Sequence, residues 1–290
     1  MRRSVTIVTS GPLSTIQDEG RPGQADTGVA RSGACDRTSS RLANRLVGNP
    51  SDAAVLEVTF GGLRLRADNG VVVVTTGARC ADAPAHNGPL HLRAGDELVL
   101  PAPVAGLRTY VALRGGIVVP PVLGSRSTDL LSGLGPAQVR DGDVLPLGEP
   151  DNPMPGVDLA PVAEPAPTDV SVRVTHGPRW SWFTSAAQEA LSGTTYRMSS
   201  DSNRIGLRLE GQPLERSEAG ELPSEGIVRG AIQVPPSGQP LLFLADHPVT
   251  GGYPIIAYVD DADVDRCAQL RPGQAVSFRL GRDRGLEGSP

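Results

Sequence analysis

Residues 54–78, AVLEVTFGGLRLRADNGVVVVTTGA, hold the pattern that decides the fold of this chain. Three short runs, AVLEVTF, LRLRA and VVVVTTGA, are rich in apolar and β-branched residues and are separated by Gly-Gly and by Asp-Asn-Gly. Such runs are typical of β-strands, because branched side chains fit a pleated surface and glycine allows the tight turns between strands. The stretch therefore predicts consecutive strands joined by short turns.

The same pattern continues on both sides of this stretch. Further predicted strands are SVTIVTS at 4–10, ELVLP at 97–101, TYVALRGGIVV at 109–119, VSVRV at 170–174 and IGLRLEG at 205–211. With 35 glycines and 27 prolines available for turns, the chain is predicted to be mainly β, as a barrel or a sandwich. Three short helices are expected, at 39–48, 184–191 and 262–270.

A proline-rich segment divides the chain. Residues 150–168, PDNPMPGVDLAPVAEPAPT, show no sustained periodicity and carry repeated prolines, which favour an extended connector. We therefore expect an N-terminal β domain at 1–149 and a C-terminal β domain at 169–281. The end of the chain, 282–290, is expected to be disordered.

The composition argues against several classes of function. A net charge of -5 with 3% aromatic residues gives neither the basic surface nor the stacking platform that nucleic-acid binding needs. No apolar run approaches the roughly 18 residues of a membrane span, and no secretory core follows the start, so we expect a cytoplasmic protein. The three distant cysteines are predicted to be free thiols. The four histidines share no zinc-site spacing with them, so we assign no metal, although one shared with a partner stays open.

The chain contains no lysine, so all 27 basic residues are arginine. A Walker-type lysine, a Schiff-base lysine and a biotinylated lysine are therefore all excluded. Any phosphate or carboxylate that binds here must be held by arginine, by backbone amides or by residues of a partner.

The first candidate site lies near the N-terminus. Gln17, Asp18 and Arg21 crowd a glycine-rich turn within TIQDEGRPG, where a rigid loop can hold polar groups against a ligand. The alternative is a turn that uses Asp and Gly for its geometry. Asp36 then precedes the helix at 39–48, whose start Thr38 or Ser39 can cap; this N-terminus can bind an anion, or Asp36 can itself be the cap.

Three further segments carry candidate residues. In LGSRSTD the loop at 124–128 is rich in hydroxyls, is flanked by glycine and contains one cation, so it can cradle a carboxylate or phosphate. The C-terminal half contains SSDSNRIGLRLEG and, later, LADHPVTGGYP, in which His247 follows Asp246 on a tight loop and can act as a general acid or base. No spacing supports a nucleophilic triad, a GxSxG elbow or a dinucleotide fingerprint.

These segments together resemble the family of the 5-oxoprolinase C subunit, also called allophanate hydrolase subunit 2, which includes KipA-like and biotin-dependent carboxyltransferase domains. The resemblance runs from about Val5 to Leu280 through TIQDEGRPG, SGACDR, LANRLVGN, LEVTFGG, LRGGI, LGSRSTD, SNRIGLRLEG, SEGIVRGAIQVPPSGQP and LADHPVTGGYP. It implies a mainly β fold of two tandem cyclophilin-like β-barrel domains with a few short helices.

The resemblance also implies partners and a reaction. Family members work beside a KipI-like B subunit (allophanate hydrolase subunit 1), with the active site between the two proteins. Together with a third protein, the A subunit, they hydrolyse 5-oxoproline to glutamate at the expense of ATP. This chain is then not expected to be active alone, and ATP is shared with the partner proteins.

Two alternatives to this function stay open. One is a biotin-dependent carboxyltransferase component of a urea carboxylase or allophanate pathway, with biotin on a separate protein. The other is a non-enzymatic antagonist of a KipI-like sensor-kinase inhibitor.

The resemblance carries no residue-level assignment, so the expected roles rest on side-chain chemistry, and each residue could instead be structural. Proton transfer or orientation of a proton or metal is expected of Asp18, Asp36, Asp246 and His247. Binding of substrate or phosphate is expected of Gln17, Arg21, Asn44, Asn49, Arg126, Ser127, Asn203, Arg204, Thr250 and Tyr253.

Overall fold

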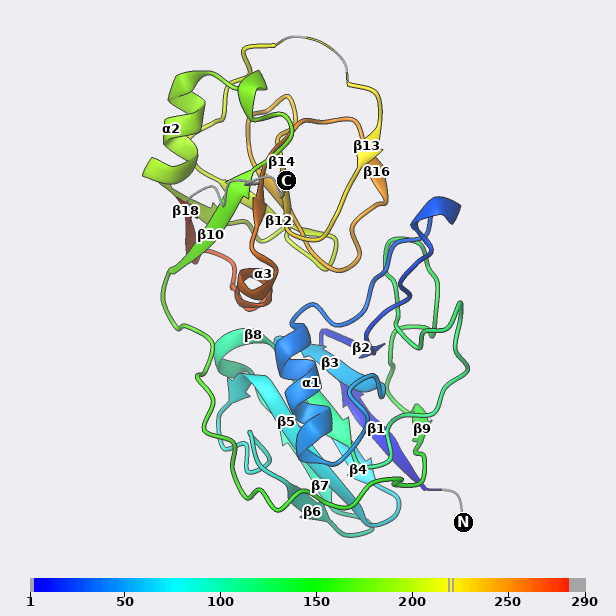
Figure 1. Ribbon diagram of the computed structural model, residues 1–290. Helices are drawn as coiled ribbons and strands as arrows, with labels where there is room; N and C mark the ends of the chain where they lie inside the picture. The colour runs from blue at the N-terminus through cyan, green and yellow to red at the C-terminus, as the bar shows by residue number, and fades with distance from the viewer. Residues whose placement is uncertain (1–2, 219, 221, 282–290) are drawn as a thin grey trace, which may run out of the picture. The chain divides into compact units, whose positions relative to one another are not determined.

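The computed structural model describes residues 3–218, 220 and 222–281. The chain divides into two compact units, Met1–Pro167 and Thr168–Pro290 (Figure 1). The expectation of a mainly β fold with a few short helices is confirmed. The predicted disorder at 282–290 lies outside the described residues.

The N-terminal unit contains two antiparallel sheets. The first, in the order β7-β4-β1-β9, is formed by β1 (Ser4–Ser10), β4 (Leu63–Ala67), β7 (Glu97–Leu100) and β9 (Val144–Pro146). The second, in the order β2-β3-β8-β5-β6, is formed by β2 (Leu13–Gln17), β3 (Val55–Thr59), β5 (Val71–Cys80), β6 (Leu90–Leu92) and β8 (Pro103–Leu113). A short 3-10 turn, η1 (Ala25–Thr27), lies in the loop after β2.

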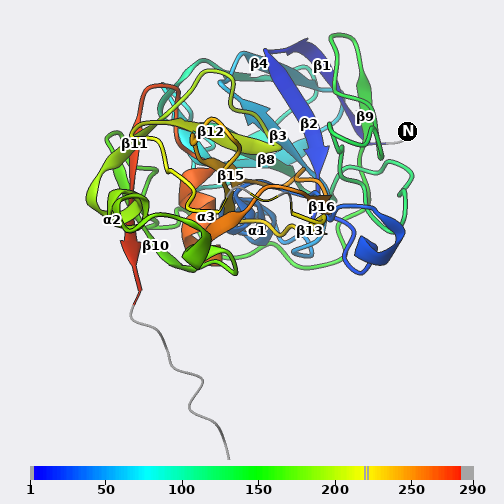
Figure 2. The same cartoon turned by 90° about the horizontal axis from the view of Figure 1, so that it is seen from above.

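Alternation of side chains along the strands builds the core of this unit. In β4, Leu63, Leu65 and Ala67 are buried, whereas Arg64 and Arg66 are exposed. The buried set joins residues of both sheets in one apolar cluster. Strand β4 pairs along its length with β1, and the two run side by side in Figure 2.

The helix α1 (Arg37–Leu46) covers one face of the five-stranded sheet, where it packs against β5 and β8 (Figure 1). Its apolar side chains join Val55, Val74 and Ala112 in a second cluster. Asp36 caps its start, because the Asp36 carboxylate accepts a hydrogen bond from Ser39 N at 2.9 Å. The prediction that Thr38 or Ser39 would be the cap is wrong, and the alternative that Asp36 is the cap is confirmed.

The strand predicted at 109–119 begins earlier and ends earlier in the structure than expected. The run at 109–119 belongs to β8, but this strand begins at Pro103 and ends at Leu113. A turn at 114–115 follows, and Gly115 and Gly116 have consecutive left-handed φ values of 99° and 71°. Local composition favoured a longer strand, and the two glycines terminate it.

The C-terminal unit is a closed barrel in the order β10-β17-β14-β15-β12-β11-β18. Its strands are β10 (Val170–His176), β11 (Thr195–Met198), β12 (Gly206–Glu210), β14 (Ala231–Gln233), β15 (Leu241–Phe243), β17 (Ile255–Val259) and β18 (Ala275–Leu280). A separate ribbon pairs β13 (Glu225–Gly226) with β16 (Thr250–Gly251). The helical elements are η2 (Trp180–Trp182), α2 (Ser185–Gly193), which packs on β18, and α3 (Asp261–Cys267), which packs on β10.

Within residues 3–218, 220 and 222–281, no helix combines the length and apolar character needed to cross a membrane. Residues 150–167 form no helix or strand and run along the N-terminal unit. Arg114 Nη2 donates to Asn152 O at 2.6 Å, and Arg79 pairs with Glu164 at 2.8 Å.

Candidate functional site

The carboxylate of Asp18 is the centre of a buried network that joins two loops of the N-terminal unit. Its oxygens accept hydrogen bonds from Gly20 N at 2.8 Å, Arg126 N at 2.6 Å, Ser125 Oγ at 2.6 Å and Ser127 Oγ at 2.5 Å. We call these five residues the Asp18 cluster. Four donors occupy the acceptor capacity of one carboxylate, so this geometry favours the structural interpretation of Asp18.

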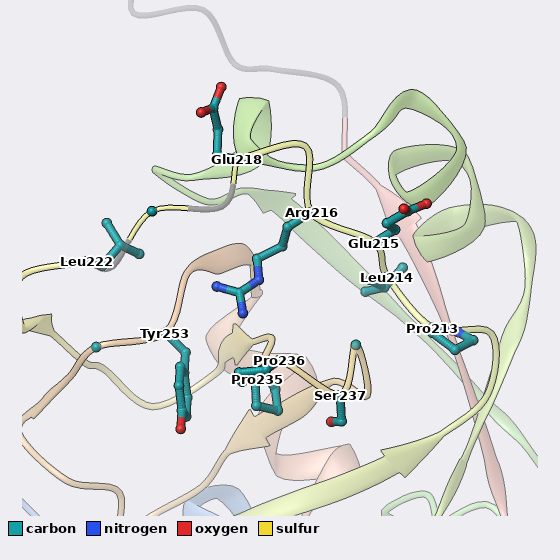
Figure 3. Close-up of a pocket in the computed structure, with 13 residues that line it drawn as sticks. Pro213, Leu214, Glu215, Arg216, Glu218, Leu222, Pro235, Pro236, Ser237 and Tyr253 are labelled. Atoms are coloured by element: carbon teal, nitrogen blue, oxygen red, sulfur yellow. The ribbon is translucent and has the colours of Figure 1, made fainter.

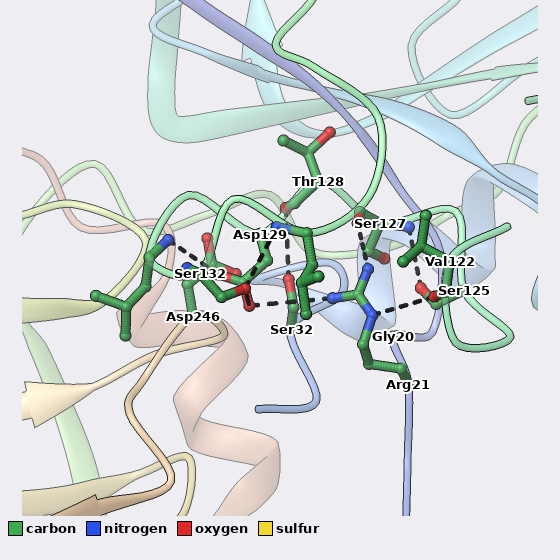
Figure 4. Close-up of polar contacts among 12 residues, drawn as sticks. Gly20, Arg21, Ser32, Val122, Ser125, Ser127, Thr128, Asp129, Ser132 and Asp246 are labelled. Carbon is green, nitrogen blue, oxygen red and sulfur yellow. Dashed lines mark hydrogen bonds and ion pairs between the residues drawn. The ribbon is translucent and has the colours of Figure 1, made fainter. Parts of the chain in front are cut away.

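Arg21 ties the same two loops together beside the Asp18 cluster (Figure 4). Its side chain is buried, and Nη2 donates to Ser127 O at 2.6 Å. Its Nη1 lies 4.0 Å from Asp129 Oδ2 and has no hydrogen-bond partner among the described residues. Gly135 allows this close packing, since a Cβ there would lie 2.0 Å from Ser127 O. Arg21 therefore clamps the loop from inside and does not face solvent.

Three of the predicted amide side chains, those of Gln17, Asn44 and Asn49, also make structural contacts. Gln17 Nε2 donates to Thr128 O at 2.9 Å. Asn49 Nδ2 donates to Asn44 Oδ1 at 3.1 Å and to Leu113 O at 2.9 Å, and Asn49 Oδ1 accepts from Gly115 N at 2.8 Å. Both asparagines lie at the end of α1, where they fix the turn into β3. For Arg126, the Nε donates to Val119 O at 3.0 Å.

A second charged network lies at the start of α1 and was missed from the sequence. Glu57 on β3 is buried; its Oε2 accepts from Cys35 N at 2.9 Å and from Tyr110 Oη at 2.8 Å. Arg108, also buried, places Nε 3.6 Å from Glu57 Oε1, and Asp36 N donates to Tyr110 Oη at 2.7 Å. Burial raises the pKa of Tyr110 well above its ordinary value of 10.0, and Glu57 and Asp36 add to the rise, so the phenol stays protonated.

A sequence signal for this network existed. Glu57 is the only charge in AVLEVTF, and Arg108 is the only charge in the buried run of β8. A lone charge inside an apolar strand must find a partner, because an ionised group without one is costly to bury. The pairing itself could not be read from the sequence, since the two residues are distant along the chain.

In the C-terminal unit, Arg204 and Asp246 form a buried pair. Arg204 Nε and Nη2 each lie 2.9 Å from a different oxygen of Asp246, and Asp246 N donates to Arg204 O at 3.0 Å. This two-point geometry holds the loop before β12 against the loop after β15. His247 follows in the chain, with Nδ1 2.8 Å from Pro248 O, and the Asn203 carboxamide accepts from Ile205 N at 2.8 Å.

The last two predicted residues lie elsewhere in the C-terminal unit. Thr250 is exposed on β16. Tyr253 is 48% exposed and lines a cavity of about 820 Å³ (Figure 3). The opposite wall carries Arg216, and Pro235, Pro236 and Ser237 form a further part of the lining. Arg216 was missed because the sequence at 212–223, QPLERSEAGELP, carries no motif that distinguishes it from a solvated turn.

The predicted residues thus fall into separate groups. Gln17, Asp18, Arg21, Ser127 and the backbone of Arg126 meet in one network, Asp36 belongs to the Glu57 network, and Asn44 pairs with Asn49. In the C-terminal unit, Arg204 and Asp246 pair, with Asn203 and His247 next to them in the chain, while Thr250 and Tyr253 lie apart from this pair. No group of three or more His, Cys, Asp or Glu side chains that could hold a metal occurs in the described part of the chain.

Comparison with known proteins places this architecture in a family. Residues 27–280 match the family described as carboxyltransferase domain, subdomain A and B. The chain is 38% identical to the C subunit of 5-oxoprolinase from Escherichia coli, over 94% of this chain and 89% of that protein. It is also 33% identical to urea amidolyase of Lachancea kluyveri, over 94% of this chain and only 16% of that protein.

A solved structure agrees with these sequence matches. The crystal structure of TTHA0988 superposes with a TM-score of 0.85 at 34% identity, covering 96% of this chain and 55% of that one. This chain thus corresponds to about half of the TTHA0988 polypeptide and to about a sixth of the urea amidolyase.

Proposed function

Because the chain belongs to the carboxyltransferase domain family, subdomain A and B, we propose that it is the C subunit of an ATP-dependent 5-oxoprolinase. The observation that carries this proposal is the 38% identity to the C subunit of a 5-oxoprolinase along 89% of that protein's length. The urea amidolyase match covers a far smaller share of its protein. Likeness along nearly a whole protein supports a shared role better than likeness to one part of a multifunctional chain.

The proposed reaction converts 5-oxoproline to glutamate with consumption of ATP. Resonance makes the lactam carbonyl a poor electrophile, so phosphoryl transfer to the carbonyl oxygen creates a leaving group before hydrolysis. Cations on the phosphates stabilise the charge that develops during such a transfer.

The side chains of this chain support a shared active site. The Asp18 carboxylate is occupied by donors from its own unit, and Arg21 and Arg204 are buried with partners of their own unit. No lysine is present to bind a polyphosphate. We therefore assign most of the ATP contacts to the partner proteins, a KipI-like B subunit and an A subunit, and we expect little activity from this chain alone.

Reconstitution tests the proposal. This chain is purified together with its two partner proteins, and glutamate and ADP are measured with 5-oxoproline, with and without ATP. We expect both products to form in equal amounts only when all three proteins and ATP are present. Glutamate formation at the same rate without this chain refutes the proposal. ADP release that does not depend on 5-oxoproline does the same.

A second candidate function is supported by the 33% identity to urea amidolyase and by the family description itself. In it the chain is a carboxyltransferase component that uses carboxybiotin. Since the chain has no lysine, the biotin would be attached to a separate carrier protein. The test adds a carboxybiotinylated carrier and urea to the purified complex. Loss of the carboxyl group from biotin only when urea is present favours this function over the first.

A further inference from the structure

The cavity in the C-terminal unit contains a cation, Arg216, that forms no ion pair with any carboxylate of the described residues. Arg216 is partly buried, and its guanidinium points into the cavity, toward the space between Tyr253 and the Pro235–Pro236 pair (Figure 3). Within the described part of the chain, no carboxylate lies within ion-pair distance of this guanidinium. Glu215 and Glu218 also belong to the lining, but both carboxylates point away from the cavity.

Hydrogen bonds to the backbone hold the Arg216 side and the Tyr253 side of the cavity. The segment around Arg216 is held on both sides, because Thr184 N donates to Glu215 O at 3.1 Å and Ser217 N donates to Trp182 O at 2.9 Å. On the opposite wall, Gln233 is buried and its Nε2 donates to Tyr253 O at 3.0 Å. Arg216 and Tyr253 are therefore held on ordered backbone on two sides of one space.

The segment Pro235–Gly238, a further part of the lining, is joined to the Arg216 side by a backbone hydrogen bond. Leu214 N donates to Gly238 O at 2.9 Å, next to Pro235, Pro236 and Ser237. Gly238 has φ of 75°, and a Cβ there would lie 2.9 Å from Pro213, so this close approach requires glycine. The cavity volume of about 820 Å³ falls in the range of roughly 300–1,000 Å³ that is usual for small-molecule sites.

The single guanidinium of the lining, that of Arg216, suits an anion with one negative charge better than a polyphosphate. One guanidinium binds one carboxylate in a two-point arrangement, with the Tyr253 and Ser237 hydroxyls as further donors. A polyphosphate carries several negative charges, and the lining offers no lysine, no second arginine and no metal ligand set to balance them. The site therefore favours a monocarboxylate over a nucleotide.

The apolar part of the lining selects the body of the ligand. Two proline rings, the Tyr253 ring and the buried Leu214 give flat or apolar surfaces beside the cation. Such surfaces suit a compact ring or a planar amide, because these pack on proline and aromatic faces without leaving polar groups unsatisfied.

We propose that this cavity is a binding site for a small cyclic monocarboxylate, with Arg216 as the carboxylate-recognising residue. If the proposed function holds, on which this part of the inference rests, the ligand is 5-oxoproline, which combines one carboxylate with a planar five-membered lactam.

Calorimetry on the full chain tests the proposal, with 5-oxo-L-proline as the probe and the uncharged 5-oxo-L-prolinamide as its neutral analogue. We expect 5-oxo-L-proline to bind at least about tenfold more tightly than the amide. Arg216→Gln should weaken 5-oxo-L-proline binding by at least about tenfold, because a charged two-point contact is lost. The matched control is Arg208→Gln, since Arg208 is exposed on β12 and is not part of the cavity. The affinity of this control should equal that of the unchanged protein.

A second measurement covers the case in which the site is complete only in the assembled enzyme. In the reconstituted complex, Arg216→Gln should raise KM for 5-oxo-L-proline at least about tenfold, whereas Arg208→Gln should leave it unchanged. An effect of Arg216→Gln in either experiment supports the proposal. Unchanged binding by the full chain together with an unchanged KM overturns it, as does equal binding of the amide.

These outcomes separate this inference from the proposed function. If the complex forms no glutamate while the chain binds 5-oxo-L-proline through Arg216, the proposed function fails and the carboxylate site stands. If glutamate forms and Arg216→Gln changes neither affinity nor KM, the proposed function stands and the cavity is removed from substrate binding.

Discussion

The Asp18 cluster and the Arg216 cavity use the same kinds of residue in opposite ways. Both combine a charged side chain with hydroxyls on glycine-containing loops between strands. In the first, four donors of the same unit surround the carboxylate, and nothing is left for a ligand. In the second, the guanidinium points into open space and its carboxylate neighbours point away (Figure 3). Whether a charged loop residue holds the fold or binds a ligand therefore depends on its internal partners.

The largest expected effect comes from opening the Asp18 cluster. We expect Asp18→Ala to lower the free energy of unfolding by at least about 4 kcal/mol, because four buried donors lose their acceptor and each such loss costs about 1–3 kcal/mol. Chemical denaturation monitored by circular dichroism measures this change. The matched control is Asp26→Ala at an exposed position, which should stay within about 0.5 kcal/mol of the unchanged protein. An equally small loss for Asp18→Ala would make Asp18 a catalytic candidate again.

In the C-terminal unit, the Arg204–Asp246 pair is a second buried charge that is satisfied by partners of its own unit. Asp246→Ala removes both carboxylate oxygens that Arg204 contacts, and the expected loss of stability is about 3 kcal/mol, as for other broken buried ion pairs. Denaturation curves of Asp246→Ala and of the double variant Arg204→Met/Asp246→Leu measure it. We expect the double variant to recover part of the loss, since it buries no lone charge. A single variant with unchanged stability would show that this pair does not hold the two loops.

His86 offers a third case, a half-buried imidazole whose two ring nitrogens are inaccessible to solvent. Neither ring nitrogen has a hydrogen-bond partner among the described residues. Burial lowers the pKa of His86 below its ordinary value of 6.5, with Glu164 opposing and Arg79 adding to the fall. The folded state therefore binds fewer protons than the unfolded state. Stability should be full above about pH 6.5 and should fall as the pH drops below that value toward the folded-state pKa.

A histidine replacement sharpens this prediction. We expect His86→Phe to flatten the decline of stability between about pH 6.5 and pH 5, measured as denaturation midpoints at several pH values. The exposed His91 provides the control, because His91→Phe should retain the decline of the unchanged protein. A decline that is equally steep in His86→Phe would assign the pH dependence to other groups.

The smallest expected effect on stability is at the Arg216 cavity. Arg216→Gln should change the free energy of unfolding by no more than about 0.5 kcal/mol, because no described carboxylate pairs with this guanidinium. Thermal unfolding of Arg216→Gln beside Arg208→Gln measures it. A loss of about 2 kcal/mol or more would show that Arg216 has a structural role, and the contrast with the Asp18 cluster would then disappear.

Local patterns predicted many of the strands and the approximate bounds of the helices, and they left the roles of the site residues open. The strands at β3, β4, β5 and β7 follow runs that are visible in the sequence, and α1 differs from its expected bounds by two residues at each end. The segments around Asp18 and Tyr253 were also singled out correctly as polar loops. The sequence leaves open whether each residue has a structural or a ligand-binding role, and no local pattern indicates a role for Arg216.

By itself, the sequence determined the period of the strands, the positions of many turns and the absence of lysine, which restricts side-chain cations that bind anions to arginine and histidine. These properties depend on residue type and on neighbours within a few positions. Only the tertiary structure decided that Ser127, 109 residues away, donates to Asp18, and that the Arg216 guanidinium points into a cavity while the carboxylates of Glu215 and Glu218 point away from it. Such pairings depend on how distant loops close in space, because a hydrogen bond acts over about 3 Å and the order of residues along the chain does not specify that distance.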